Sequence, residues 1–336
     1  MWLIIMCVMI FSMVVVGGIT RLTHSGLSIA EWKPVTGILP PLNEQAWEEM
    51  FATYRSTPEY LKINHGMSLA EFQSIFFWEY THRLLGRLIA VVFVLPYLFF
   101  LFRGKLKDGL GLKLFFGLLL GSLEGPMGWF MVKSGLVDAP HVSHYRLAAH
   151  LTLAFLFFAY LFRVILHLRV ADGEHKNSGI ARLQTASLIV ITGVCLEVLY
   201  GAFTAGLKAG FGYNTFPTMN GFWIPPDILS MQPSWLNFFE NRTCVQFVHR
   251  AIGFCLFVGV LVFRVIATRF PLNHEQRWSV DLLTAAIILQ GTLGVLTLVY
   301  VVPITLAVIH QAVAFLVFAL AIFTHFSFSS SSAHRT

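Results

Sequence analysis

Long apolar stretches, separated by shorter polar segments, recur from one end of the chain to the other. Each has about 20 residues, enough for a helix to cross a hydrocarbon core about 30 Å thick. The pattern therefore predicts an all-α integral membrane protein with eight transmembrane helices. We expect them near residues 1–20, 79–102, 111–132, 145–166, 183–205, 244–267, 280–300 and 304–326.

Composition agrees with this fold class. Of the 336 residues, 56% are hydrophobic and only 12% are charged, whereas about 25% of the residues of a soluble domain are charged. The first stretch is not expected to be a signal peptide, because no basic region precedes it and no small-residue cleavage site follows. The glycines at 17 and 18 are instead expected to break this helix into a polar turn.

The formal net charge of +6 is sorted by position along the chain. Segments 103–113, 163–182, 264–281 and the C-terminal tail hold 12 Lys and Arg against 5 Asp and Glu, and the remainder holds 11 against 12. Basic loops mark the cytoplasmic side of a membrane protein. We therefore expect both termini on the cytoplasmic or matrix side and no nucleic-acid partner.

The chain also repeats itself. The second and sixth stretches both open with the pattern x-x-x-His-Arg-x-x-Gly, at residues 79–86 and 246–253. The fourth and eighth stretches each carry a histidine followed by Ala-Phe-Leu, at 154–156 and 314–316. This repetition predicts two pseudo-symmetric four-helix bundles in parallel orientation, formed by residues 1–175 and 176–336.

Four histidines lie at one depth of the predicted bundles. His82, His150, His249 and His310 each sit near the same end of an even-numbered helix. Two histidines on separate helices of one bundle can bind one haem iron from opposite sides. The sequence therefore predicts one haem between His82 and His150 and another between His249 and His310.

Four histidines at one depth also have other interpretations: they could line a polar seam, bind zinc or form a proton pathway with a glutamate. Recurrence of the same pair in both halves argues against a polar seam, and two histidines per half fall short of a closed four-ligand zinc site.

Arginines accompany the histidines. Arg83 and Arg250 directly follow a predicted ligand, Arg87 lies one turn further on, and Arg146 lies four residues before His150. Because guanidinium groups pair well with carboxylates, we expect these arginines to bind haem propionates. The alternative is that they extend to the membrane surface.

The two halves differ near their first histidine. Glu79 lies three residues before His82, whereas Gln246 precedes His249 by the same spacing. The carboxylate is our candidate catalytic group of the N-terminal half; the alternative is a charge that complements the helix dipole. Glu124 and Glu197 also lie inside predicted helices, and the sequence suggests no role for them.

Polar, glycine-containing segments after the first and fifth stretches are expected to cover the two sites, unless they are ordinary surface loops. Four further histidines fall in the segments predicted to lie outside the membrane. We expect them at the surface: His24, His65, His141 and His144.

These motifs together resemble the haem A synthase family, specifically its alphaproteobacterial and mitochondrial branch. The resemblance extends over nearly the whole chain. It rests on the motifs at 17–23, 31–34, 79–87, 128–136, 145–150, 213–217 and 310–311.

The resemblance implies that the N-terminal half takes haem O as substrate and oxidises its C8 methyl group to a formyl group by successive hydroxylations. His82, His150 and Glu79 would act there, while His249 and His310 would hold a permanent b-type haem. The resemblance also implies a role in assembling terminal oxidases. Glu124, where relatives tend to have glutamine, and Lys208, where an acidic residue is usual, depart from the family pattern.

The expected location is the bacterial inner membrane, or the mitochondrial inner membrane if the chain is eukaryotic. Expected partners are the lipid bilayer, a haem O synthase that delivers substrate and an electron donor or acceptor; homo-oligomerisation stays open. The rival interpretations are a bis-histidine cytochrome or haem carrier without substrate chemistry, and a haem-free transporter.

Overall fold

The computed structural model describes residues 1–31, 37–107, 109–133, 142–169 and 178–329. Every regular element in these ranges is a helix, apart from one isolated bridge between Met219 and Phe222. Eight helical segments among the described residues are long and apolar enough to cross a membrane. The predicted all-α membrane fold with eight spans is therefore confirmed.

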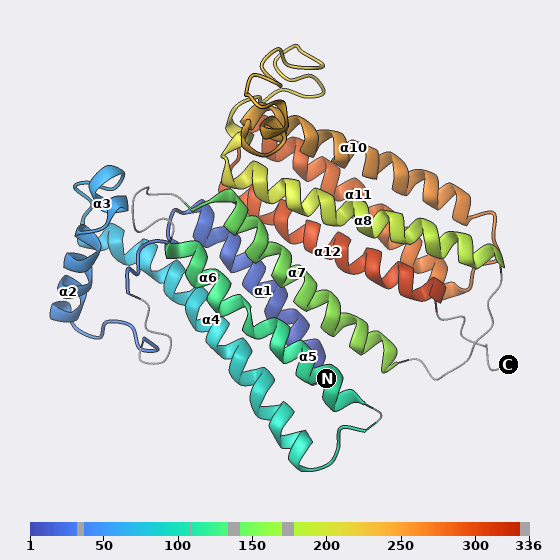
Figure 1. The fold of residues 1–336 in the computed structure, drawn as a ribbon, viewed down its shortest axis with the longest axis horizontal. Coiled ribbons are helices and arrows are strands. Elements are labelled where there is room, and N and C mark those ends of the chain that lie inside the picture. Colours follow the sequence, from blue (N-terminus) through green and yellow to red (C-terminus); the bar gives the residue numbers. More distant parts are fainter. Residues whose placement is uncertain (32–36, 108, 134–141, 170–177, 330–336) are drawn as a thin grey trace. The chain divides into compact units, whose positions relative to one another are not determined.

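The spans follow the chain in order (Figure 1). They are α1 (Trp2–Leu22), α4 (Leu69–Phe102), α5 with α6 (Leu110–Ser122 and Glu124–Lys133), α7 (His144–His167), α8 (Ser178–Gly206), α10 (Arg242–Ala267), α11 (His274–Val299) and α12 (Ile304–Ser329). Between them lie the short helices α2 (Glu44–Arg55), α3 (Pro58–Lys62), η1 (Ala209–Phe211), η2 (Ser234–Leu236) and α9 (Asn237–Glu240).

Helix caps explain where two spans begin earlier than expected. α4 starts at Leu69 because Ser68 and Glu71 form a reciprocal capping box that satisfies the first backbone N–H groups. Asn273 and Gln276 do the same for α11. Apolar length locates a span, but the cap decides its first residue.

The prediction that the first helix breaks at Gly17 and Gly18 is wrong. α1 continues through Gly17 and Gly18 and ends at Leu22. Glycine in a helix lowers stability by only about 1 kcal/mol, and here Gly17 is needed for close contact with α4, as described below.

The described chain divides into two compact units, Met1–Phe158 and Ala159–Thr336, so that α7 contributes to both. The boundary expected at residues 175 and 176 lies outside the described residues. In the first unit, α1 packs along α4, which also contacts α5. Phe157 of α7 reaches Phe93 of α4 and Gly121 of α5, which ties α7 to the same group of helices.

In the second unit, each long helix contacts two others: α8 packs on α10 and α12, and α11 packs on α10 and α12. This ring of contacts is the arrangement of a four-helix bundle. An apolar cluster stabilises one end of the bundle. It contains Leu183, Phe263, Ala267, Val280 and Phe328.

The segment between α1 and α4 has a small core of its own. Phe51 and Tyr54 of α2 stack on Phe72 near the start of α4, at ring-centroid distances of 5.0 and 5.1 Å. Tyr54 donates a hydrogen bond to the buried carboxyl group of Glu59 at 3.1 Å. Burial raises the pKa of Glu59 to about 7; the charge of Glu79 adds to the increase, while the Tyr54 hydrogen bond opposes it.

Candidate functional site: two histidine pairs

Each of the four predicted histidine ligands packs against a glycine of the preceding span. The distance from an ideal Cβ at the glycine to the nearest ring atom is short in every case. It is 3.2 Å for Gly17 and His82, 3.4 Å for Gly128 and His150, 3.4 Å for Gly201 and His249, and 3.0 Å for Gly294 and His310. A Cβ at Gly17 or Gly294 would press on the imidazole, whereas a Cβ at Gly128 or Gly201 would just touch it, so each ring lies directly against a glycine.

The predicted partners lie in the same unit, and each pair interacts electrostatically: His82 with His150 in the first unit, and His249 with His310 in the second. No group of three or more His, Cys, Asp or Glu suited to a metal ion occurs among the described residues.

Two glutamates that the sequence left without a role contact these histidines. Glu124 Oε2 lies 2.7 Å from His150 Nδ1. Glu197 Oε1 lies 3.1 Å from His249 Nδ1. Because Nδ1 faces the carboxylate, Nε2 is the ring nitrogen left to bind a metal.

A sequence signal for these contacts was present. Glu124 and Glu197 each lie four residues before the glycine that packs on the same histidine, so glutamate and glycine share one helix face. The third member of this pattern is Gln290, whose amide nitrogen lies 3.5 Å from His310 Nε2. The four-residue spacing predicts which side chains share one helix face, but it does not predict which histidine that face contacts.

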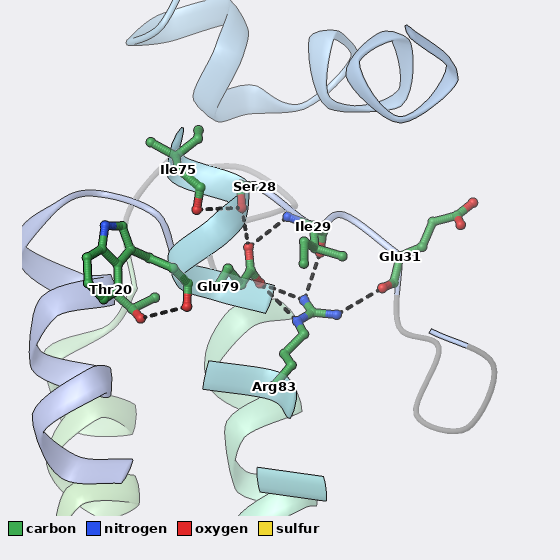
Figure 2. Close-up of polar contacts among 8 residues, drawn as sticks. Thr20, Ser28, Ile29, Glu31, Ile75, Glu79 and Arg83 are labelled. Carbon is green, nitrogen blue, oxygen red and sulfur yellow. Dashed lines mark hydrogen bonds and ion pairs between the residues drawn. The ribbon is translucent and has the colours of Figure 1, made fainter. Parts of the chain in front are cut away.

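Glu79, which lies on α4 three residues before His82, is buried and accepts four hydrogen bonds (Figure 2). Its Oε2 accepts from Ser28 Oγ and from the Ile29 backbone N–H, both at 2.7 Å. Its Oε1 accepts from Arg83 Nη2 at 2.7 Å and from Arg83 Nε at 3.1 Å. Arg83 also donates to the carbonyl oxygens of Ile29 and Glu31, at 2.8 and 3.0 Å. The pair thus fastens the segment after α1 onto α4.

The second unit contains an equivalent contact between a helix and the preceding segment, but it is made by an amide in place of a carboxylate. Gln246 Nε2 donates to the Tyr213 carbonyl oxygen at 2.9 Å. Arg250 Nη2 donates to the same oxygen at 2.9 Å and to the Thr215 carbonyl oxygen at 3.1 Å. Glu79 and Gln246 are therefore structural counterparts, and the difference between them does not require a catalytic explanation.

The remaining predicted arginines lie close to this framework. Arg87 lines a small pocket together with Arg83, Tyr80 and Glu31. Arg146 Nη1 donates to the Phe130 carbonyl oxygen at 2.7 Å, and its guanidinium lies 3.8 Å from the centre of the Phe130 ring. Arg146 thereby links α7 to α6.

The other histidines divide into two groups. His24 and His65 are exposed, as expected. His144 is buried, with its ring 4.0 Å from that of Tyr145, so the expectation of a surface position is wrong. The reason is that His144 begins α7, where its side chain is packed rather than held in a loop. His141 and residues 32–34 and 134–136 of the motifs lie outside the described residues.

These observations define the class: an all-α polytopic membrane protein in which glycine-lined helix faces present two pairs of histidines. The family described as cytochrome oxidase assembly protein matches residues 1–322. A heme A synthase of Nitrosospira multiformis is 50% identical over 325 residues, covering 96% of this chain and 91% of the relative. Those of Nitrosomonas eutropha and Flavobacterium psychrophilum are 45% and 44% identical, covering 96% and 98% of this chain and 91% and 97% of the relative. The chain belongs to the haem A synthase family.

Proposed function

We propose that this protein oxidises the C8 methyl group of haem O to a formyl group, which gives haem A for terminal oxidases. The observation that carries the proposal is the histidine pair of the first unit, in a chain that belongs to the haem A synthase family. The conversion removes four electrons from the methyl carbon. Two successive hydroxylations, with the oxygen atoms taken from O2 or water and the electrons exchanged with an external redox partner, give an alcohol and then a gem-diol, which loses water.

In this proposal haem O is the substrate of the first unit, held by His82 and His150. His249 and His310 hold a b-type haem in the second unit. The donor set fits such groups: the imidazoles lie in helix interfaces where glycines leave room for them. Gln290 Oε1, close to His310, is also a buried oxygen without a hydrogen-bond partner among the described residues. A bound haem supplies redox chemistry and an iron centre; the chain supplies ligands, orientation and exclusion of water.

The polar side chains around the first site position the substrate. Arg83, Arg87 and Arg146, with Arg250 in the second unit, are assigned to the haem propionates, in addition to the carbonyl contacts that three of them make. Glu79 is assigned to assist oxidation at the edge of the substrate. Its hydrogen bonds to Ser28 and Arg83 hold the carboxylate in one orientation, so that it can receive a proton at Oε1 or Oε2.

The b-type haem is proposed to exchange electrons with an external donor or acceptor. Haem O synthase is proposed to deliver the substrate. The eight spans make the chain a multi-pass membrane protein. We place it in the bacterial inner membrane, or in the mitochondrial inner membrane if it is eukaryotic, with both termini on the cytoplasmic or matrix side because the basic loops lie there.

A bis-histidine cytochrome or haem carrier is the second candidate. It is favoured by the finding that Gln246 makes the counterpart of the Glu79 contact, which removes one reason to infer chemistry in the first unit alone.

Haem extraction with mass analysis tests both candidates. The chain is expressed with a haem O source, and haems are extracted from the purified protein. The proposal expects haem A, which has one more oxygen and two fewer hydrogens than haem O, together with haem b. Recovery of haem O and haem b without any haem A supports the carrier instead.

A further inference from the structure

One feature of the two units is not used by the function proposed above. Each span that presents a glycine to a histidine carries, four residues earlier, a side chain on the same helix face. These four side chains differ chemically. They are Met13 before Gly17, Glu124 before Gly128, Glu197 before Gly201 and Gln290 before Gly294.

Met13 and Glu197 occupy equivalent places. The Glu197 carboxylate lies over Gly253, four residues after His249, with Oε1 2.9 Å from an ideal Cβ there. The Met13 methyl group lies over Gly86, four residues after His82, with Cε 3.2 Å from an ideal Cβ there. The first unit therefore has a thioether where the second unit has a carboxylate.

This replacement changes what supports the histidine. Glu197 contacts Nδ1 of His249, and Glu124 does the same for His150. A carboxylate on Nδ1 fixes the ring orientation and strengthens the Nε2 donor, commonly by 10- to 100-fold in metal affinity. A thioether is at most a weak acceptor. The His82 ring is also turned over relative to that of His249: Nε2 and Cδ2 of His82 lie against Gly17, whereas Cε1 and Nδ1 of His249 lie against Gly201.

We propose that His82 is the exchangeable ligand of the substrate site, whereas His150 is retained. Met13 is the positioning residue that makes the difference, because it puts a thioether on the α1 face that meets the His82 ring, where α8 puts the carboxylate of Glu197 beside His249. With haem bound there, His82 would leave with the lone pair of its Nε2, so that one coordinate bond would be lost and no electron transferred. In the second unit Glu197 keeps His249 in place. This inference rests on the proposed function, and it would explain how a site with two histidine ligands could release one of them.

Carbon monoxide tests this assignment on the full-length protein, purified with its haems and reduced. CO binds ferrous haem only where a ligand can leave, and its binding is read from the Soret difference spectrum. The wild type is expected to bind CO at about half of its haem. Met13→Glu installs the counterpart of Glu197 and is expected to weaken CO binding at least about 10-fold.

Glu197→Met is the reciprocal variant, expected to make the haem of the second unit reactive to CO as well. Met13→Leu is the matched control, since it keeps the site apolar and is expected to bind CO like the wild type. A second readout is the reduction potential, which Met13→Glu should lower because a stronger donor favours ferric iron. Haem content is measured for each variant, so that Glu197→Met decides the question if Met13→Glu loads no haem.

The inference is overturned if the wild type binds no CO, if Met13→Glu with full haem content binds CO like the wild type, or if Glu197→Met leaves the second haem unreactive. Its failure is distinct from failure of the proposed function. Formation of haem A with any of those three results removes only the role of Met13 and His82. Selective CO binding without any haem A removes the oxidation and leaves the ligand assignment intact.

Discussion

Glu79 and Arg83, one turn apart on α4, form an ion pair of 2.7 Å, and both side chains also hydrogen-bond to the segment that follows α1. Helix α4 also carries His82. Because the same two side chains hold the loop and flank a predicted ligand, we expect the positions of the loop and the ligand to be coupled.

Replacement of Glu79 by glutamine tests this coupling. Glu79→Gln removes the charge paired with Arg83 and one acceptor for the Ser28 and Ile29 donors, a loss of about 1–3 kcal/mol in unfolding free energy. We expect haem O to accumulate and haem A to fall at least about 10-fold, a barrier increase of about 1.4 kcal/mol, measured in extracted haems. The matched control is Gln246→Glu, which should leave haem A formation within about twofold. Equal haem A yields from Glu79→Gln and the wild type would remove Glu79 from the mechanism.

Adding a methyl group at Gly294 should displace His310. The new Cβ would lie 3.0 Å from His310 Cε1, closer than ordinary van der Waals contact, so the ring must shift. Gly294→Ala is therefore expected to lose most of the b-type haem, measured as haem b per protein after extraction. Gly259→Ala on α10 is the control, because nothing lies within 4 Å of its Cβ position. Equal haem b in the two variants would show that the glycine contact is not needed.

Removing the Glu124 carboxylate should lower the affinity of the first site for haem O. Glu124→Leu deprives His150 Nδ1 of its partner at 2.7 Å, and losses of 10- to 100-fold in metal affinity are typical of such changes. The ratio of haem O plus haem A to haem b is expected to fall. Glu124→Gln should fall in between, since Gln290 faces His310 in the second unit. An unchanged ratio in Glu124→Leu would mean that His150 needs no support.

The stability of the α2–α3 segment should decrease as the pH rises from about 4.5 to 7. Burial raises the pKa of Glu59 from 4.5 to about 7, so the folded segment binds a proton in this range that the unfolded segment releases. Because of this linkage, the free energy of unfolding falls by about 3 kcal/mol between pH 4.5 and pH 7 and does not fall further above pH 7. Glu59→Gln, which stays neutral, should abolish the dependence. Limited proteolysis within residues 44–62 at pH 5 and pH 8 measures it; equal wild-type cleavage rates at both pH values would exclude a buried neutral carboxyl group.

The eight spans were accessible from the sequence, and so was the repeat from which the pairing of histidines is predicted. A membrane helix is recognised from apolar length, because lipid requires every backbone group to be bonded within the helix. The repeated His-Arg-x-x-Gly pattern indicates that the two halves have the same arrangement of helices, although it does not say how those helices pack. The family resemblance rested on the same residues.

The contacts that distinguish the histidines could not be obtained in that way. Helical periodicity shows that Glu124 and Gly128 share a face, but which ring the face meets depends on how two helices pack. The Glu79 contacts likewise depend on a loop that returns to α4 from about 50 residues away. Spacing along one helix is a local property, whereas the partner of a side chain is decided by packing between helices that are remote in the chain.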